Sequence, residues 1–552
     1  MPKKHPTHKV TFQPMGISTQ VAAGKTIMDA AAGQDIRLRS DCGGKGLCGK
    51  CVVEVTQKDH VSPLTENEAK LLARDLIANG GRLACAARIE GPLSVSVSES
   101  VLDSAEAIGK SLSGTLETGD RHDTATAHSG SGSLGVAIDI GTTTLALYLC
   151  DLASREVLQS AAEANPQRRF GEDVISRIAY CTEHADGLES LQRVIVDAIN
   201  RLIGACVETT GASREAITKV SVVGNTTMQH LFTGTHPGIL GRSPYMPESC
   251  EAVELPAPDV GLDLPASCTV HVFPVISGFV GGDTVGVMLS EKPHVRDEIS
   301  LIIDIGTNGE IVFGNRDALW VTSCATGPAL EGAHIECGMR ASSGAIESVR
   351  IDPASYRVDY TVIGRENGAD PRGLCGSGII DAVAEMVKTG LILPSGRLHE
   401  GLPGISADDQ GIGREFEIYA GNGAGPRRVV LTLRDVRQVQ LAKAALFTGI
   451  KLLMEHAGIA TIDRLVLTGA FGAHFNWQNA VVIGMLPESV QQAEVSVVAN
   501  AAGRGAVLAL FDEREKVEIR AAARKAHLLE LANDPEFAMK FALHTAFPDP
   551  TR

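Results

Sequence analysis

The pattern of apolar and polar positions divides the chain into two differently built parts. Near the beginning, short apolar runs alternate with Gly, Pro and polar residues. The elements predicted there are a β-hairpin over 9–13 and 18–21, a helix over 26–35 with Ile27, Ala30 and Ala31 facing inward, and a strand over 51–55. From Leu134 onward the apolar runs become nearly continuous, which is typical of strands buried on both faces.

Residues 101–133 separate these parts and contain few large apolar side chains but many Gly, Ser and Thr. This composition is typical of a flexible tether rather than of a packed element. A chain of 552 residues is also long enough for more than one domain. The predicted organisation is an N-terminal domain over 1–98, a flexible linker over 99–133, and two α/β parts over 134–298 and 299–552.

Four cysteines carry the candidate chemistry of the N-terminal domain. Cys42, Cys48 and Cys51 have the spacing C-x5-C-x2-C, and Cys85 follows 34 positions after Cys51. The first gap is one residue wider than the plant-type ferredoxin spacing C-x4-C-x2-C. The glycines that alternate with these cysteines allow a backbone to bend closely around inorganic sulfide.

The N-terminal segment therefore resembles a [2Fe–2S] ferredoxin domain of the adrenodoxin-like branch, which implies a β-grasp fold and a cluster bound by Cys42, Cys48, Cys51 and Cys85. Two other interpretations stay open at this point. Zinc sites use paired short C-x2-4-C loops, and only one such pair exists here. Unrelated buried thiols or two disulfides are the remaining alternative.

A strand–turn–strand pattern occurs twice in the longer part. The sequence Asp-Ile-Gly-Thr begins at Asp139 and again at Asp304, 165 residues later, each time at the end of an apolar strand. A Gly-Thr turn between antiparallel strands directs backbone N–H groups and hydroxyls toward a phosphate. The aspartate at each strand end can hold Mg²⁺ directly or through water. A repeat of this length suggests two related halves facing one another.

A third element fits the same pocket. The segment from Asp463 to His474 is predicted as a strand that enters a Gly-rich turn before a helix, and such a turn lets the backbone approach a nucleoside. The candidate phosphate-binding residues are Gly141, Thr142, Thr143, Thr144, Gly306, Thr307 and Asn308, and the candidate nucleoside-binding residues are Gly469, Ala470, Phe471 and Gly472.

These three motifs resemble the phosphate-1, phosphate-2 and adenosine loops of the actin/hexokinase/Hsp70 superfamily. The resemblance implies an α/β fold of two RNase H-like halves that bind ATP and Mg²⁺ between them, with Asp139 and Asp304 as the catalytic aspartates.

A ferredoxin domain ahead of this ATPase core, together with the segments 165–177 and 327–333, resembles the reductive activators of corrinoid-dependent methyltransferases. The resemblance covers the chain from about Lys9 to Phe511. It implies an enzyme that uses ATP to pass one electron from a [2Fe–2S] cluster to Co(II) of a corrinoid protein, regenerating Co(I). It also implies an upstream low-potential electron donor, and a homodimer is known within the family.

Two other functions are compatible with these motifs. A kinase or carbohydrate-type phosphotransferase with an iron–sulfur regulatory domain needs a general base beside an acceptor hydroxyl. The candidate bases are Asp173, Asp283 and Glu331, none of which the sequence places at an acceptor. The third hypothesis is a ferredoxin-like electron carrier whose ATPase part is only a scaffold.

Charge and composition narrow the expected partners. The net charge is −16, which argues against general nucleic-acid binding. The charge is uneven, because residues 1–98 contain 13 Lys and Arg against 9 Asp and Glu. No apolar run approaches 18 residues and the start lacks an apolar leader, so we expect no membrane segment and a cytoplasmic protein with its other cysteines reduced.

Overall fold

The structure is a computed structural model of the chain. It describes residues 6–34, 36, 38, 44–46, 49–72, 74–98, 101, 133–407, 413–421, 428–469 and 475–549. Most of the predicted linker, 99–100 and 102–132, therefore lies outside the described residues. The chain divides into two compact units, one comprising Met1–Ala105 with Pro166–Tyr180 and the other comprising Glu106–Asn165 with Cys181–Arg552.

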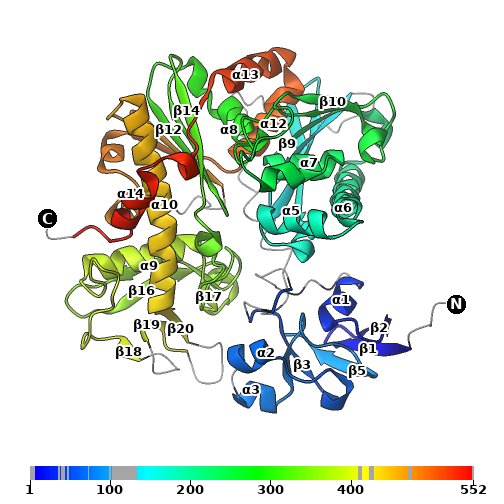
Figure 1. The fold of residues 1–552 in the computed structure, drawn as a ribbon, viewed down its shortest axis with the longest axis vertical. Helices are drawn as coiled ribbons and strands as arrows, with labels where there is room; N and C mark the ends of the chain where they lie inside the picture. Colours follow the sequence, from blue (N-terminus) through cyan, green and yellow to red (C-terminus); the bar gives the residue numbers. More distant parts are fainter. Residues whose placement is uncertain are drawn as a thin grey trace. The chain divides into compact units, whose positions relative to one another are not determined.

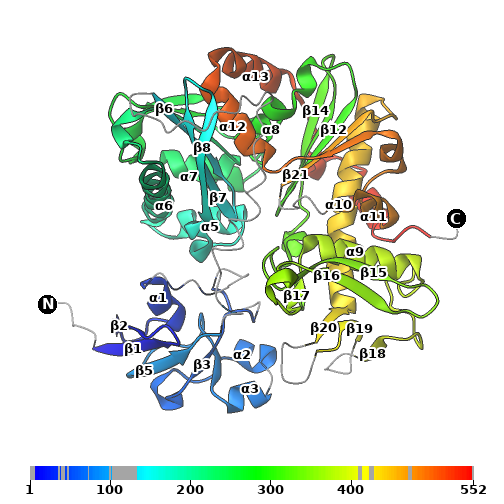
Figure 2. The same cartoon turned by 180° about the vertical axis from the view of Figure 1, so that it is seen from behind.

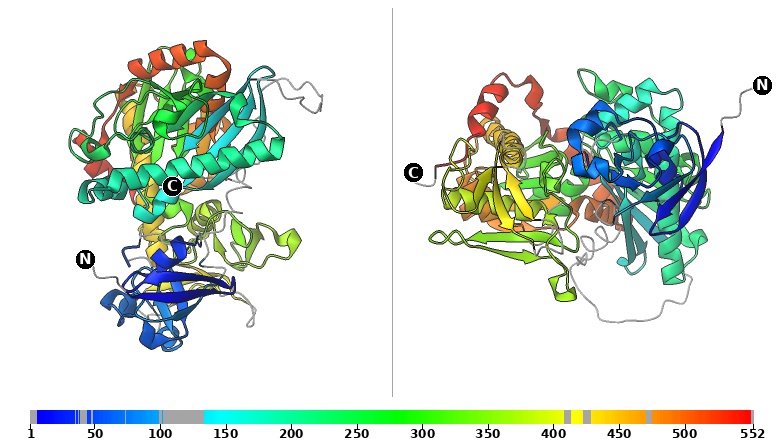
Figure 3. Two further views of the ribbon diagram at one scale, coloured as in Figure 1. Left: turned by 90° about the vertical axis from the view of Figure 1, so that its right-hand side faces the viewer. Right: turned by 90° about the horizontal axis from the view of Figure 1, so that it is seen from below.

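The N-terminal domain is built on a five-stranded sheet with the order β2-β1-β5-β3-β4. Its elements are β1 (Thr7–Gln13), β2 (Ile17–Ala22), α1 (Ile27–Ala32), β3 (Val52–Val55), α2 (Glu66–Leu71), α3 (Arg74–Ala78), β4 (Gly81–Leu83) and β5 (Leu93–Ser96). The hairpin β1–β2 forms one edge of the sheet, and β1 pairs in parallel with β5 (Figure 3). This arrangement confirms the expected β-grasp fold.

The helix α1 shows both what the sequence specifies and where the prediction was too long. Thr26 and Asp29 form a capping box at its start, and Ile27, Ala30 and Ala31 are buried as expected. The helix ends at Ala32, not at residue 35 as predicted, because Gly33 follows as its C-cap. Glycine loses more conformational freedom in a helix than any other residue, so it favours an end there.

The first α/β half contains a six-stranded sheet with the order β10-β11-β9-β6-β7-β8. Its strands are β6 (Leu134–Ile140), β7 (Thr144–Asp151), β8 (Glu156–Ala164), β9 (Ile217–Gly224), β10 (Val253–Pro256) and β11 (Thr269–Val272). Its helices are α5 (Val174–Glu183), α6 (Gly187–Thr210), α7 (Thr226–Thr233) and α8 (Gly282–Glu291). The strands β6, β7 and β8 are antiparallel, whereas β9 pairs in parallel with β6 and β11.

The second half repeats five strands of this topology in a sheet with the order β22-β21-β12-β13-β14-β23, in which the sixth strand lies at the opposite edge. Its strands are β12 (Ser300–Ile305), β13 (Gly309–Gly314), β14 (Leu319–Cys324), β21 (Arg464–Gly469), β22 (Glu494–Val497) and β23 (His527–Leu528). Three antiparallel strands are again followed by parallel neighbours, β21 and β22. The duplicated RNase H-like halves expected from the repeated motif are therefore confirmed.

Helices and two small sheets complete the second half. The helices are α9 (Gly376–Lys388), α10 (Leu433–Ala457), α11 (Trp477–Val482), α12 (Ala501–Phe511), α13 (Glu513–Lys525) and α14 (Phe537–His544). The small sheets consist of β15 (Ala345–Ile351), β16 (Val358–Val362) and β17 (Gly373–Leu374), and of β18 (Ile405–Ala407), β19 (Arg414–Tyr419) and β20 (Val429–Thr432). The long helix α10 lies against β13 and β14 (Figure 2). Among the described helices, none is both long and apolar enough to cross a membrane.

The helices α8 and α12 join the two halves through direct backbone contact (Figure 1). A Cβ atom on Gly505 would lie 2.0 Å from the carbonyl oxygen of Gly286, so a larger residue does not fit at this crossing. Around this crossing, buried side chains of both halves form one core, including Val285, Ile302 and Val466. The crossing fixes the ends of β6 and β12 near one another.

Candidate functional site

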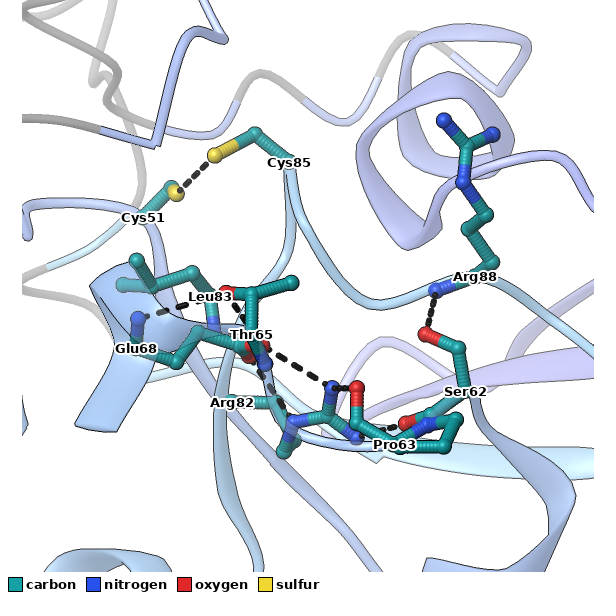
Figure 4. A network of polar contacts seen from close by, with 9 residues as sticks. All are labelled: Cys51, Ser62, Pro63, Thr65, Glu68, Arg82, Leu83, Cys85 and Arg88. Atoms are coloured by element: carbon teal, nitrogen blue, oxygen red, sulfur yellow. Dashed lines mark hydrogen bonds and ion pairs between the residues drawn. The ribbon is translucent and has the colours of Figure 1, made fainter.

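Two of the four predicted cluster ligands, Cys51 and Cys85, lie side by side at the rim of the N-terminal sheet (Figure 4). Their Sγ atoms are 3.4 Å apart, far longer than a disulfide bond of about 2.05 Å. Two thiolates bound at about 2.3 Å to one tetrahedral metal lie roughly 3.8 Å apart. The pair therefore fits two ligands of one iron. Cys42 and Cys48 lie outside the described residues.

Three described glycines of the predicted ligand loop have a left-handed backbone. Gly44, Gly46 and Gly49 have φ angles of +80°, +69° and +70°, a region that favours glycine. A Cβ atom on Gly44 would lie 3.9 Å from the Cβ of Cys85, so this turn closes over the ligand. These conformations agree with the expectation that the glycines let the backbone bend around sulfide.

A buried ion pair fixes the strand that leads to Cys85 (Figure 4). The carboxylate of Glu68 accepts hydrogen bonds from Nε of Arg82 at 2.8 Å and from the backbone N–H of Leu83 at 3.1 Å. Arg82 also donates to the carbonyl oxygen of Ser62 at 2.8 Å. Burial acts to raise the pKa of Glu68, but its hydrogen bonds with Arg82, Thr65 and Leu83 outweigh this effect and lower the pKa.

Each repeated turn is closed by one backbone hydrogen bond, which spans four residues in the first turn and three in the second. The N–H of Gly141 donates to the carbonyl oxygen of Thr144 at 3.0 Å, and the N–H of Gly306 donates to that of Asn308 at 2.8 Å. Asn225, the N-cap of α7, donates to the hydroxyl of Thr142 at 2.9 Å and so supports the first turn. Both turns connect antiparallel strands, as the sequence predicted.

The structure gathers carboxylates at the ends of β6 and β12. Burial, then the charges of Asp283 and Asp304, raise the pKa of Asp139 to about 8, and a hydrogen bond with Asn500 opposes this only partly. Burial and the charge of Asp283 raise the pKa of Asp304 to about 7. Burial raises the pKa of Asp283 to about 6. Glu310 is affected in the same direction, by burial first and then by Asp283 and Asp304. Such a cluster favours a bound cation.

Two members of this cluster were not assigned to it from the sequence. Asp283 stands at the start of α8 and was considered only as a base for a phosphotransferase. Glu310 lies directly opposite Asp304 in the antiparallel pair β12–β13. Like charges that face each other across strands destabilise a sheet. The pairing of Glu310 with Asp304 across the predicted strand–turn–strand was therefore a signal of function in the sequence.

The third predicted motif reaches the same place at its first residue. A Cβ atom on Gly469 would lie 2.5 Å from Oδ1 of Asp304 and 2.4 Å from the carbonyl oxygen of Ile305. Gly469 has a φ of +100°, so its lack of a side chain permits both the conformation and the contact. Ala470, Phe471 and Gly472 lie outside the described residues.

Glu331 and Asp173 have different places in the structure. Glu331 accepts hydrogen bonds from the hydroxyls of Thr307, at 3.0 Å, and of Thr143, at 3.2 Å, so it connects the two repeated turns. Asp173 is exposed and accepts a hydrogen bond from the N–H of Ser176 at 2.7 Å, near the start of α5. This hydrogen bond is that of a helix cap.

Among the described residues, no group of three His, Cys, Asp or Glu side chains is arranged to bind one metal ion directly. A Mg²⁺ ion held through its waters does not need such a group, because Mg²⁺ usually keeps several of its waters. The carboxylates of Asp139, Asp283 and Asp304 are suited to accept hydrogen bonds from such waters.

Comparisons with known proteins match three successive parts of the chain. Residues 10–90 match the 2Fe-2S iron-sulfur cluster binding domain, 134–295 the RACo middle region, and 298–552 the C-terminal domain of RACo, the ASKHA domain. The corrinoid activation enzyme RamQ of Eubacterium limosum is 38% identical over 426 residues, which are 75% of this chain and 70% of RamQ. The chain belongs to the RACo family.

Other relatives of this RACo-family chain extend the likeness. The [Co(II) methylated amine-specific corrinoid protein] reductase of Methanosarcina barkeri is 26% identical over 388 residues, covering 64% of this chain and 66% of that protein. The solved structure of a reductive activator for corrinoid, iron-sulfur protein matches with a TM-score of 0.69 at 31% identity and covers 98% of both chains. The similarity therefore includes the cluster domain and both ATPase halves.

Proposed function

We propose that the chain carries out ATP-dependent reductive activation of a corrinoid protein, passing one electron from a [2Fe–2S] cluster to Co(II) and regenerating Co(I) for methyl transfer. The observation that carries this proposal is the presence of a ferredoxin-type cluster domain and a two-lobed ATPase in one chain of the RACo family. A separate low-potential electron donor is needed to reduce the cluster between turnovers.

The proposed cluster ligands are Cys42, Cys48, Cys51 and Cys85. The close approach of the Cys51 and Cys85 thiols supports this assignment. The positive φ angles of the glycines between Cys42 and Cys51 support it as well. When bound, the cluster stores one electron at low potential. The chain's own contribution is to hold the ligand strand in place, through the buried pair of Glu68 and Arg82.

We infer that the phosphates of ATP are held by the turns Gly141–Thr144 and Gly306–Asn308, and that the nucleoside lies at Gly469–Gly472. The closed turns and the contact of Gly469 with Asp304 support this placement. Bound Mg²⁺ neutralises phosphate charge. Asp139, Asp304 and Asp283 would hold this Mg²⁺ through its waters, and their pKa values are raised mainly by burial, with neighbouring carboxylates adding to the effect at Asp139 and Asp304.

Asp283 is also a candidate general base for ATP hydrolysis. Burial raises the pKa of its side chain in the metal-free protein, so this carboxylate binds a proton more readily than an exposed aspartate does. Burial at the start of α8, beside Asp304, is the cause of this tuning. Asp283 would act as the base of a phosphotransferase does, except that it would take the proton of a water instead of that of an acceptor hydroxyl.

The free energy needed to reduce Co(II) is of a size that nucleotide binding can supply. Plant-type ferredoxins have potentials near −400 mV, and Co(I) is a stronger reductant. A deficit of roughly 120–180 mV corresponds to about 3–4 kcal/mol for one electron. Differential binding of a nucleotide to two conformations can supply a free energy of this size. ATP therefore drives a change of shape, and no phosphoryl acceptor is required.

The proposal is tested by following the products of ATP under anaerobic conditions. The full chain, loaded with its cluster and supplied with a reductant, is mixed with a Co(II) corrinoid protein and ATP. We expect the spectrum of Co(I) to appear together with inorganic phosphate. Formation of a phosphorylated small molecule without Co(I) would favour the phosphotransferase hypothesis instead.

A further inference from the structure

Glu331 is held on a rigid turn of the second half. It ends the 3-10 turn Pro328–Glu331, whose neighbours Ala329 and Leu330 are 2% and 1% exposed within the core of that half. The following Gly332 has a φ of +81°, and a Cβ atom there would lie 2.5 Å from the carbonyl oxygen of Met339. The direction of the Glu331 side chain is therefore set by packing on both sides of it.

The carboxylate of Glu331 divides its two oxygens between the two halves. Oε1 accepts the hydroxyl of Thr307 at 3.0 Å, and Oε2 accepts the hydroxyl of Thr143 at 3.2 Å. Oε1 also lies against the second turn, because a Cβ atom on Gly306 would be 3.7 Å from it. None of the ion pairs among the described residues involves Glu331. The hydrogen bonds that its carboxylate accepts there come from hydroxyl groups.

We propose that Glu331 is a positioning residue that clasps the two phosphate-binding turns and competes with the triphosphate of ATP for their hydroxyls. An anionic phosphate and the anionic carboxylate of Glu331 need the same hydroxyl donors, and two negative groups beside one donor repel one another. ATP must therefore displace Glu331 from Thr143 or Thr307. Displacement disconnects the turns at this point, which links phosphate binding to a movement of one half against the other.

This inference rests on the proposed function, which places the phosphates at these turns. It adds that the chain discriminates nucleotides by phosphate number, because AMP has no phosphate that must reach the clasp. Removing the charge of Glu331 should therefore strengthen the binding of ATP while leaving that of AMP unchanged. A residue with a purely structural role would weaken both when replaced.

The test measures ATP, ADP and AMP affinities by calorimetry on the full chain with its cluster, without a corrinoid protein. For Glu331→Gln we expect ATP to bind about tenfold more tightly, corresponding to about 1.4 kcal/mol, ADP to gain less and AMP to stay the same. Glu331→Ala should change the same affinities in the same direction. The control Glu366→Gln alters an exposed glutamate of the same half and should change none of them.

Unchanged or weaker ATP binding by a folded Glu331→Gln protein would overturn the clasp, and so would an equal gain for AMP. These outcomes are separable from a failure of the proposed function. That function fails if the wild-type chain does not form Co(I) with ATP, whereas the clasp is decided by nucleotide affinities alone.

Discussion

Two sets of carboxylates in the described residues, one in each part of the chain, have their pKa values shifted in opposite directions. In the N-terminal domain, Glu68 is fully buried but is paired with Arg82, which is 4% exposed, and its pKa is lowered. At the ends of β6 and β12, Asp139 and Asp304 lie among other carboxylates, and burial raises the pKa of each. A buried acid with its own cationic partner supports a fold, whereas clustered acids without one favour the binding of protons or of a cation.

The largest effect expected from this comparison is that the cluster can be lost while ATP hydrolysis continues. Cys85→Ser should remove or destabilise the cluster and abolish Co(I) formation, while ATP hydrolysis continues because no cysteine serves the nucleotide. Iron analysis and phosphate release measure both properties on one preparation. The wild-type chain should contain two irons, and four irons or zinc would contradict the assignment of the cluster.

The reciprocal variant is Asp304→Ala, which should lower ATP turnover roughly a hundredfold or more, because a metal-positioning charge at the phosphates is lost. The visible spectrum of the cluster should not change. A control is Asp317→Ala, an exposed aspartate of the same half. Normal hydrolysis by Asp304→Ala would show that the nucleotide site has been misplaced.

Removing one partner of the buried pair should destabilise the cluster domain. For Glu68→Ala we expect a loss of about 3–5 kcal/mol, because Arg82 is left buried without its counterion. Glu66→Ala removes an exposed glutamate of the same helix, whose partner Lys70 is also exposed, and should cost less than about 0.5 kcal/mol. Denaturant titrations that follow the cluster absorbance measure both. Equal effects of the two variants would remove the contrast on which the comparison rests.

Neutralising a member of the acidic cluster should have the opposite sign. Asp139→Asn should raise the free energy of unfolding by roughly 2 kcal/mol at pH 8 in the absence of Mg²⁺ and nucleotide. The pKa of Asp139 is about 8 in the folded protein, against an ordinary value of 3.8. Between these pH values the native state binds more protons than the unfolded state, so stability falls as pH rises. The gain should disappear below about pH 4. A variant less stable than wild type at pH 8 would show that Asp139 already has a compensating partner.

The sequence predicted those features that depend on local order along the chain. The duplicated Asp-Ile-Gly-Thr motif, the hairpin geometry and the inward face of α1 follow from spacing and residue type. It did not place Asp283 or Glu331, because each reaches the site through long-range packing: Asp283 through the crossing of α8 and α12, and Glu331 through a turn fixed by Gly332. The end of α1 was missed because Gly33 acts as a cap within an otherwise helical pattern.

The central claim is that ATP makes an otherwise unfavourable electron transfer possible. It is tested most directly by reducing the cluster in advance, mixing the chain anaerobically with excess Co(II) corrinoid protein, and recording both chromophores in a rapid-mixing experiment. With ATP we predict one Co(I) for each cluster oxidised, and with no nucleotide or with Asp304→Ala we predict neither change. Formation of Co(I) at the same rate and yield without ATP would contradict the account.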